Sequence, residues 1–221
     1  FRNLLLSDEF DIMKPQCARR PYQDMTKPLM HYYINTSHNT YLFNSQVIGA
    51  SNAEAYNRVL LKGGRAVEID CYDGPDGQPI VYHSFTFVKS CTFETIIRAI
   101  KPNLFITSPY PVVLDIENHC TFSQQKEMAR ILKEVLGDYL LTEAIFTDDP
   151  TVLPSPDELK YKVLVRSPQV TPLKALQSMN LQLPLWTKVV EPEFDKLLLY
   201  LRNVLYDAKT NCKLTNYLHY L

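Results

Sequence analysis

The fold is decided by three polar segments that each end an apolar run: Ser37-His38-Asn39-Thr40, Val67-Glu68-Ile69-Asp70 and Leu114-Asp115-Ile116-Glu117. The apolar runs are residues 31–35, 65–69 and 111–116, and they have the composition of buried strands. In an α/β barrel, the chemistry lies at the carboxyl ends of successive parallel strands. The sequence therefore predicts an α/β protein whose site is built from these three segments.

Two of the intervening helices are predicted from the residues at their ends. Ser51-Asn52-Ala53-Glu54 has the form of a capping box, which opens a helix through about Lys62. Gly63-Gly64 ends that helix, because glycine tolerates the left-handed turn that follows a helix. Thr121-Phe122-Ser123-Gln124 has the same capping pattern, and the helix that it opens is predicted to close at Gly137.

The remaining elements complete an alternation of strands and helices. Residues 92–100 have one apolar helical face and stop at Pro102. Residues 73–77 form a turn before a short strand over residues 79–83, and residues 161–165 form the last strand. Short connections between these elements predict parallel strands with right-handed crossovers. We therefore expect about four strands, the first half of a TIM-type barrel of roughly eight strands.

The two ends of the chain are expected to differ from the barrel region, which covers residues 28–168. Residues 1–27 mix charged residues with prolines, which indicates the end of another region and a linker. Residues 169–221 contain several prolines, and residues 193–208 have the apolar spacing of a helix. This last segment is predicted to be a divergent helical tail without a further βα repeat.

The composition excludes several classes of protein. A chain of 221 residues with 46% hydrophobic residues is long enough for one domain with a full core. Its net charge of −1 gives no case for a nucleic-acid partner. No apolar run approaches the roughly 20 residues of a membrane span, and residues 1–10 lack the features of a signal peptide. Five dispersed cysteines favour reduced thiols in a cytoplasmic protein.

The polar segments contain four hard oxygen donors: Asn39, Glu68, Asp70 and Glu117. Glu68 and Asp70 are two residues apart, so they point to the same side of an extended strand. Carboxylate and amide oxygens suit Ca²⁺ or Mg²⁺ better than zinc. The plainer alternative is that these groups are solvated, or paired with an arginine such as Arg65.

Two histidines, His38 and His83, stand close to the acidic residues in the sequence. A single histidine is more often a surface or packing residue, but two beside a metal site fit phosphoryl transfer. One protonated histidine would stabilise the charge on the phosphoryl group, and the other would protonate the leaving oxygen. His31, His119 and His219 have no such neighbours in the sequence, and we expect them to be structural.

At these residues the chain resembles the X half of the catalytic barrel of eukaryotic phosphoinositide-specific phospholipase C, in particular its delta and zeta classes. The resemblance covers roughly residues 20–168, and residues 1–19 are similar to the end of the EF-hand lobe that precedes this barrel. The matching motifs are Tyr22-Gln23-Asp24-Met25, residues 37–42, 67–71, 73–77 and 80–83, Glu117-Asn118-His119-Cys120 and Leu153-Pro154-Ser155-Pro156.

The resemblance implies Ca²⁺-dependent cleavage of phosphatidylinositol 4,5-bisphosphate into inositol 1,4,5-trisphosphate and diacylglycerol, through a cyclic phosphate. It also implies a cytoplasmic signalling protein that acts peripherally at the inner membrane surface. By the same match, Glu68 or Glu117 would accept the proton of the attacking hydroxyl. His83 would act as general acid and then as base, and His38 would stabilise the transition state. The implied Ca²⁺ ligands are Asn39, Glu68, Asp70 and Glu117.

The chain departs from the family pattern at three places. It has Ser84 and Phe85 where the family commonly has glycine and histidine. Where the family has two lysines for the ring phosphates of the substrate, this chain has Arg166 and Pro168. Arg166 suits that substrate-binding role and Pro168 does not. The Y half of the barrel is not recognisable in residues 169–221, so we expect a Y half from a longer parent or another chain as a partner.

These departures leave two alternatives open. The first is a catalytically inactive relative that binds phosphoinositide or a protein partner as a regulator. The second is a simpler phosphodiesterase barrel of one domain. Both histidines and all four oxygen donors are present, which favours the enzyme.

Overall fold

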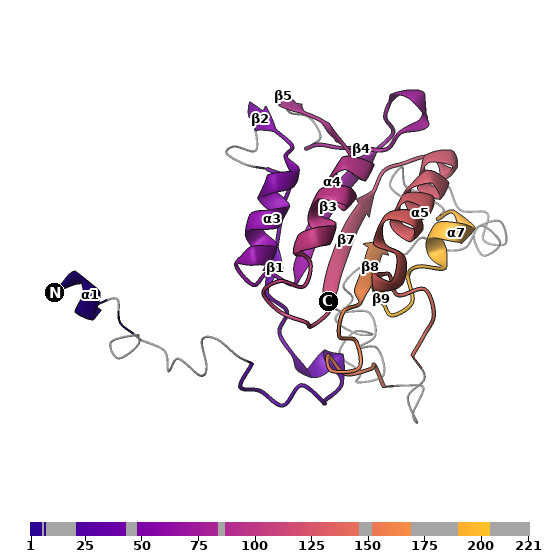
Figure 1. Cartoon of the computed structure of the whole chain (residues 1–221). Coiled ribbons are helices and arrows are strands. Elements are labelled where there is room, and N and C mark those ends of the chain that lie inside the picture. Colours follow the sequence, from indigo (N-terminus) through magenta and orange to yellow (C-terminus); the bar gives the residue numbers. More distant parts are fainter. Residues whose placement is uncertain are drawn as a thin grey trace, which may run out of the picture.

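The computed structural model describes residues 1–5, 7, 21–42, 48–83, 87–145, 152–168 and 190–203. Within them, a mixed seven-stranded sheet carries helices along one of its faces (Figure 1). The described helices are α1 (Arg2–Leu5), α3 (Ala53–Leu61), α4 (Phe93–Ile100), α5 (Phe122–Leu136) and α7 (Pro192–Asp195). Shorter 3₁₀ turns cover Leu29–His31, Pro75–Gly77, Lys101–Asn103 and Gly137–Tyr139.

Five strands of the main sheet run parallel, in the order β1, β3, β7, β8 and β9. They span Thr36–Ser37 (β1), Ala66–Tyr72 (β3), Val112–Asn118 (β7), Val163–Pro168 (β8) and Leu201–Asn203 (β9). Two antiparallel strands, β4 (Ile80–Val81) and β6 (Cys91–Thr92), continue the sheet from the last residues of β3. A separate parallel pair joins β2 (Ile48–Ala50) to β5 (Phe87–Lys89). The expected α/β alternation is thus confirmed, and the described strands form an open sheet with β6 and β9 at its ends.

The two faces of the parallel strands bury different residues. Val67 and Ile69 of β3 belong to the large apolar core beneath the helices. We call the opposite face the inner face. There Ala66, Val113 and Leu164 of three adjacent strands form a second apolar cluster at the amino ends of the strands. Side chains alternate along a strand, so residues two and four positions further on share this inner face.

The helix α3 begins one residue later than the capping box predicts. Asn52 is the N-cap, and its side-chain oxygen accepts a hydrogen bond from the main-chain N–H of Glu54. The hydroxyl of Ser51, which was predicted to cap the helix, is buried and makes no hydrogen bond with any described residue. The predicted end is confirmed, because Gly63 has a φ of +91°.

The capping box predicted for α5 is wrong, because both of its polar residues bind a neighbouring turn instead. Thr121 is the N-cap by position but makes no side-chain capping bond. Its hydroxyl donates to Asp73, and the Gln124 amide both accepts from and donates to the main chain of Gly74. These bonds hold the turn after β3 against the start of α5. The predicted closure at Gly137 is confirmed by its φ of +57°.

The first predicted strand, residues 31–35, is wrong in position. A 3₁₀ turn covers Leu29–His31, and the parallel pairing with β3 begins only at Thr36. The main-chain oxygen of Asn35 accepts hydrogen bonds from the N–H groups of Arg65 and Ala66, so this residue anchors the strand start. The strand is therefore shorter and lies closer to the polar loop at 37–40.

The helix predicted over residues 193–208 is also wrong. The structure has a short helix, α7, followed by the strand β9, which pairs in parallel with β8. Phe194, Leu197 and Leu198 have the helical spacing because all three are buried in the core beneath the helices. A further βα unit therefore does follow β8, and residues 204–208 lie outside the described residues.

The boundaries at residues 27/28 and 168/169 stay predictions. Residues 190–203 pack on the barrel region: the N–H of Glu191 donates to Gln125 of α5 at 2.8 Å, and Lys133 pairs with Glu193 at 2.9 Å. Of residues 1–27, the structure describes 1–5, 7 and 21–27. No helix in the described ranges has the length and apolar character needed to cross a bilayer.

Candidate active site

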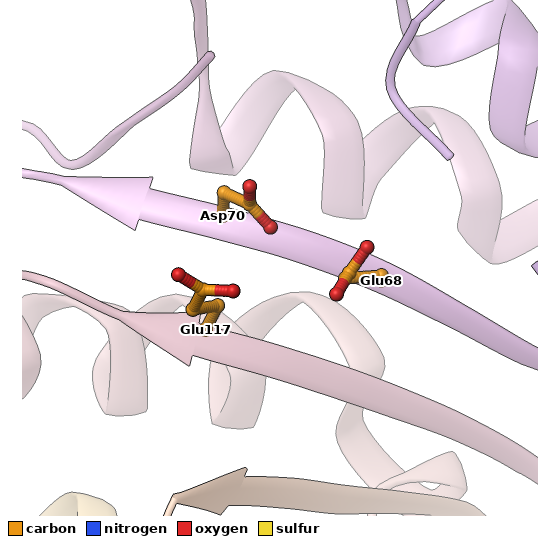
Figure 2. A group of neighbouring side chains, drawn as sticks. All are labelled: Glu68, Asp70 and Glu117. Atoms are coloured by element: carbon orange, nitrogen blue, oxygen red, sulfur yellow. The ribbon is translucent and has the colours of Figure 1, made fainter. Parts of the chain in front are cut away.

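Three carboxylates meet on the inner face near the carboxyl ends of β3 and β7. Glu68 and Asp70 lie on β3, and Glu117 lies on β7 directly opposite Asp70 in the parallel register. Each offers an oxygen atom, and these oxygens all lie within 4.8 Å of one another. Figure 2 shows the three side chains on the two neighbouring strands. The sequence prediction that these residues gather at one edge of the sheet is therefore confirmed for three of the four oxygen donors.

The fourth donor, Asn39, is held beside them by the loop after β1. Asn39 adopts a left-handed conformation with a φ of +46°, which asparagine tolerates better than most residues. Its main-chain N–H donates to Glu68 Oε2 at 2.5 Å. In return, the N–H of Glu68 donates to the hydroxyl of Thr40 at 3.1 Å. These two bonds fix the loop against β3.

Tyr41 links Asn39 to the carboxylate cluster. Its ring is 0% exposed, and its hydroxyl donates to Asp70 Oδ2 at 2.6 Å. The same hydroxyl lies 3.0 Å from Asn39 Oδ1, within hydrogen-bond distance. Burial, and then the bond to Asp70, raise the pKa of Tyr41 far above its ordinary value, so the phenol stays protonated. The sequence reasoning assigned no role to this residue, although a buried tyrosine hydroxyl usually has a partner.

Asp70 is the most buried of the three carboxylates, with 6% of its surface exposed. Burial raises its pKa to about 6; the bond from Tyr41 lowers it, and the charges of Glu117 and Glu68 raise it further. Its second oxygen, Oδ1, is buried and makes no hydrogen bond with any described residue. A buried carboxylate oxygen beside two more carboxylates is unfavourable unless a cation compensates it. The donors present therefore fit a hard divalent cation such as Ca²⁺.

The two predicted catalytic histidines come from different segments of the chain, His38 from the loop after β1 and His83 from the segment after β4. His38 is mostly exposed, at 77% of its side chain, and its Nε2 lies 3.7 Å from Glu68 Oε2. His83 follows β4 and is half-buried. The pKa of Glu117 is lowered first by a hydrogen bond from His119 and then by the charges of His119, His38 and His83, so both predicted histidines lie within electrostatic range of this carboxylate.

A third histidine, His119, contacts the cluster, although the sequence reasoning expected it to be structural. Its Nε2 lies 2.6 Å from Glu117 Oε1, and this bond is the main reason that the pKa of Glu117 is lowered. The imidazole stacks on Tyr72 with ring centroids 4.4 Å apart and an angle of 5° between the planes. The i, i+2 spacing of Glu117 and His119 was the missed signal, because the same spacing was used for Glu68 and Asp70.

Arg166 lies one row below the cluster on the inner face and is engaged by an acidic residue. It is opposite Asp115 in the register of β7 and β8. Its Nε donates to Asp115 Oδ1 at 2.9 Å, and its Nη2 donates to Asp115 Oδ2. The two side chains are only 17% and 12% exposed. Asp115 was not among the predicted site residues, and its pairing with Arg166 bears directly on the predicted substrate contact.

The remaining histidines lie elsewhere or outside the described residues. His31 closes the 3₁₀ turn before β1, and His219 is outside the described residues. Pro168 is the last residue of β8 and pairs in register with Asn203 of β9. The site thus consists of groups from β3, β7, the loop after β1 and the segment after β4.

The comparisons with known proteins agree with this geometry. A family model described as "Phosphatidylinositol-specific phospholipase C, X domain" matches residues 25–168. The chain is 50% identical over 166 residues to 1-phosphatidylinositol 4,5-bisphosphate phosphodiesterase delta-4 of Bos taurus, covering 75% of this chain and 21% of that protein. It is 51% identical over 153 residues to the zeta-1 protein of Sus scrofa, covering 69% and 24%.

A solved structure supports the fold. The crystal structure of S. officinalis PLC21 is similar with a TM-score of 0.77 and 34% sequence identity, and the match covers 93% of this chain and 28% of that one. The chain thus spans only about a quarter of these relatives or less. The resemblance to the delta and zeta classes is confirmed. Since the family model covers more than half of the chain, including all of the site described above, the chain belongs to the family of phosphatidylinositol-specific phospholipase C X domains.

Proposed function

We propose that this chain is the X half of a Ca²⁺-dependent phospholipase C that cleaves phosphatidylinositol 4,5-bisphosphate into inositol 1,4,5-trisphosphate and diacylglycerol. The observation that carries the proposal is the carboxylate cluster with the buried Oδ1 of Asp70, which has no hydrogen-bond partner among the described residues. The names of the delta-4 and zeta-1 relatives, which specify this phosphodiester substrate, support it.

The proposed Ca²⁺ ligands are Asn39, Glu68, Asp70 and Glu117. When bound, Ca²⁺ would neutralise charge on the phosphate and lower the pKa of the inositol hydroxyl that attacks it. Asp70 would contribute Oδ1, since its other oxygen accepts the Tyr41 hydrogen bond. Glu117 has one oxygen on His119, which leaves the other for the ion.

Side chains of the protein act as the general bases and the general acid of the reaction. Glu68 or Glu117 accepts the proton of the attacking hydroxyl, as ionised carboxylates can. His83 gives a proton to the diacylglycerol oxygen, and it later takes one from the water that opens the cyclic phosphate. His38, which is exposed beside Glu68, donates a hydrogen bond to the phosphoryl oxygens as negative charge develops on them.

We further propose that the enzyme works in the cytoplasm, peripherally at the inner membrane surface, where its lipid substrate is found. The open sheet in the described residues leaves room for a Y half from a longer parent or another chain to complete the barrel. Residues 28–168 are then the X region, and residues 1–27 the end of an EF-hand-like region and a linker.

A second candidate function is a regulator that binds phosphoinositide or a protein partner without turnover. The pairing of Arg166 with Asp115 argues against turnover, because it occupies two N–H groups of the arginine proposed to hold a phosphate of the substrate. An arginine already neutralised by a carboxylate attracts a phosphate less than a free one. Phosphoinositide hydrolysis separates the two functions.

The experiment measures release of soluble inositol phosphate from vesicles that contain phosphatidylinositol 4,5-bisphosphate. The chain is assayed alone and mixed with the Y half of the bovine delta-4 relative, each with free Ca²⁺ or with a chelator. We expect Ca²⁺-dependent product in the mixture. His83→Ala should abolish product but leave Ca²⁺ binding intact, whereas His31→Ala, outside the site, should change neither.

The other outcomes are equally informative. Product from the chain alone would mean that residues 169–221 complete the active site. If folded chain and folded Y half bind the vesicles and release no product, the enzyme proposal fails and the regulator is supported. If His83→Ala retains wild-type hydrolysis, the general-acid assignment is wrong.

A further inference from the structure

Tyr41 joins two proposed cation ligands that come from different parts of the chain. Asn39 belongs to the loop after β1, and Asp70 belongs to β3. The Tyr41 hydroxyl lies 2.6 Å from Asp70 Oδ2 and 3.0 Å from Asn39 Oδ1. A phenol carries a single proton to donate, so Asp70 and Asn39 share it, and the shorter distance favours the charged acceptor.

The position of this hydroxyl is fixed by its surroundings. The ring of Tyr41 is fully buried in the core beneath the helices. Its main-chain oxygen accepts a hydrogen bond from the N–H of Asn52 at 2.9 Å, and Leu42 next to it forms an antiparallel bridge with Ser51. The phenol therefore has a rigid anchor on both the ring and the backbone.

The hydrogen bond from Tyr41 gives the two oxygens of the Asp70 carboxylate different environments. Oδ2 receives the phenol proton, while Oδ1 is buried without a hydrogen bond to any described residue. With Oδ2 fixed, rotation of the carboxylate is restricted, and Oδ1 is the atom left for a cation. The same hydroxyl also restrains the Asn39 amide. A single oxygen atom therefore fixes the orientation of two proposed ligands that lie on separate elements.

We propose that Tyr41 is a positioning residue for the cation site: its hydroxyl orients the Asp70 carboxylate and the Asn39 amide toward the oxygens of Glu68 and Glu117. This inference rests on the proposed function, since the ion is the Ca²⁺ proposed above. Tyr41 acts through Asp70 and Asn39 and touches neither the ion nor the substrate. Groups that orient ligands in this way typically change metal affinity by about 10- to 100-fold when they are removed.

A second buried tyrosine provides a matched control. Tyr56 of α3 is also 0% exposed, and its hydroxyl donates to the main-chain oxygen of Glu68 at 2.9 Å. This bond supports β3 but contacts no side chain of a proposed ligand. Tyr41→Phe and Tyr56→Phe thus each remove a hydrogen-bonding phenol oxygen from an equally buried position, and only the Tyr41 hydroxyl is bonded to ligand side chains.

The test is calorimetric titration of Ca²⁺ into the full 221-residue chain. Wild type, Tyr41→Phe, Tyr56→Phe and Asp70→Asn are compared, with thermal unfolding in chelator as the measure of stability. We expect both tyrosine variants to lose similar stability. Only Tyr41→Phe should bind Ca²⁺ about 10- to 100-fold more weakly, with Tyr56→Phe within about twofold of wild type. Asp70→Asn marks the loss of a ligand itself.

Activity gives a second readout that a purely structural role would not move. In the mixture with the Y half, Tyr41→Phe should lower hydrolysis at limiting Ca²⁺ and regain most of it at saturating Ca²⁺. Tyr56→Phe should show no such dependence on Ca²⁺. The Ca²⁺ concentration for half-maximal activity should shift by the same factor as the calorimetric affinity.

Three results would overturn the inference. The first is Ca²⁺ binding by Tyr41→Phe within twofold of wild type. The second is equal weakening of binding by both tyrosine variants, and the third is unfolding of Tyr41→Phe alone in chelator, which would identify a structural residue. A folded wild type that binds no Ca²⁺ is a different failure, because it removes the proposed cation site itself.

Discussion

The two faces of the parallel strands use neighbouring residues for opposite purposes. On the face beneath the helices, Val67 and Ile69 of β3 are fully buried in one apolar core. On the inner face, the side chains change along each strand. The amino ends carry Ala66 and Val113 in an apolar cluster, and the carboxyl ends carry the acidic groups. The face beneath the helices is apolar along its whole length, whereas the inner face changes from apolar to acidic toward the carboxyl ends of the strands.

This gradient shows why stability and chemistry can be separated in this protein. A uniform apolar face stabilises the sheet through burial. The graded face places like charges next to one another: Asp70 lies opposite Glu117, and Glu68 is on the same strand. Such a cluster is unfavourable in the metal-free protein and useful only with a cation. Substitutions on the two faces should therefore have different consequences.

The largest expected effect on stability is from Ile69→Ala, on the face beneath the helices. The Ile69 side chain is fully buried, although its neighbours in the sequence, Glu68 and Asp70, belong to the site on the other face. Its truncation should lower the free energy of unfolding by about 4 kcal/mol, because it leaves a cavity in a packed core. Urea unfolding in the presence of chelator measures the change.

The matched change on the inner face is Glu117→Gln. Its side chain is 49% exposed and faces two other carboxylates, so its neutralisation should change the free energy of unfolding by less than about 1 kcal/mol. The same variant should lose most of its affinity for Ca²⁺ in calorimetry. A loss of stability as large as that of Ile69→Ala would show that the two faces are not separable.

The next effect concerns the ion pair of Asp115 and Arg166, in the middle of the inner face. Asp115→Asn removes the charge that compensates a guanidinium with 17% exposure. We expect a loss of about 3 kcal/mol in the free energy of unfolding, since a largely buried charge is then left unpaired. The double variant Asp115→Asn/Arg166→Met should recover more than half of that loss.

A double-mutant cycle in urea separates the pair from its context. If the single and double variants lose the same stability, Arg166 does not depend on Asp115. The Arg166 guanidinium would then be free to leave Asp115 and bind a substrate phosphate at little cost in stability. Recovery in the double variant would instead support a structural pair at the base of the site.

A smaller effect depends on pH and comes from Asp70. Its folded pKa of about 6 lies above its ordinary value of 3.8, chiefly because of burial. The folded state therefore binds a proton more tightly than the unfolded state. In chelator, the free energy of unfolding of wild type should fall relative to Asp70→Asn as the pH rises from about 4 to about 6, on the order of 2 kcal/mol.

Above about pH 7 the difference between the two proteins should be constant, because Asp70 is then ionised in both the folded and the unfolded wild type. Urea unfolding at half-unit steps of pH measures this difference, and the subtraction cancels groups far from Asp70. A free energy of unfolding of wild type that falls relative to Asp70→Asn as the pH falls from about 6 to about 4 would contradict the raised pKa. The variant keeps an oxygen that can accept the Tyr41 hydrogen bond.

The sequence predicted the fold best where a strand is buried on both faces or a helix has one apolar face. Residues 65–69 and 111–116 were correctly assigned to strands, because their apolar runs lie within or next to β3 and β7. Residues 193–208 were wrongly assigned to one helix. There the apolar spacing arises from a short helix and a turn that bury Phe194, Leu197 and Leu198 in the core beneath the helices, and from a strand whose Leu201 is buried in the inner-face cluster.

The site was predictable where ligands share a strand and less so where they do not. The same-side spacing of Glu68 and Asp70 and their meeting with Glu117 were predicted from the strands. Tyr41 and Asp115 were missed, because their roles depend on contacts across the sheet or between a loop and a strand. Such contacts follow from the register, which the sequence does not specify at the level of one residue.

The smallest predicted effect tests the start of α3, which covers the apolar face. The sequence pattern names Ser51 as the cap, whereas the structure gives that role to Asn52. Asn52→Ala should lower the free energy of unfolding by about 1 kcal/mol, because the N–H of Glu54 loses its acceptor. Ser51→Ala should be neutral or slightly stabilising, since the buried Ser51 hydroxyl bonds to no described residue and its removal relieves that burial. Urea unfolding of both variants decides between the two assignments, and a larger loss from Ser51→Ala would favour the capping box. In either case Ca²⁺ binding should stay within about twofold of wild type, because the change acts on the helix layer and leaves the inner face unchanged.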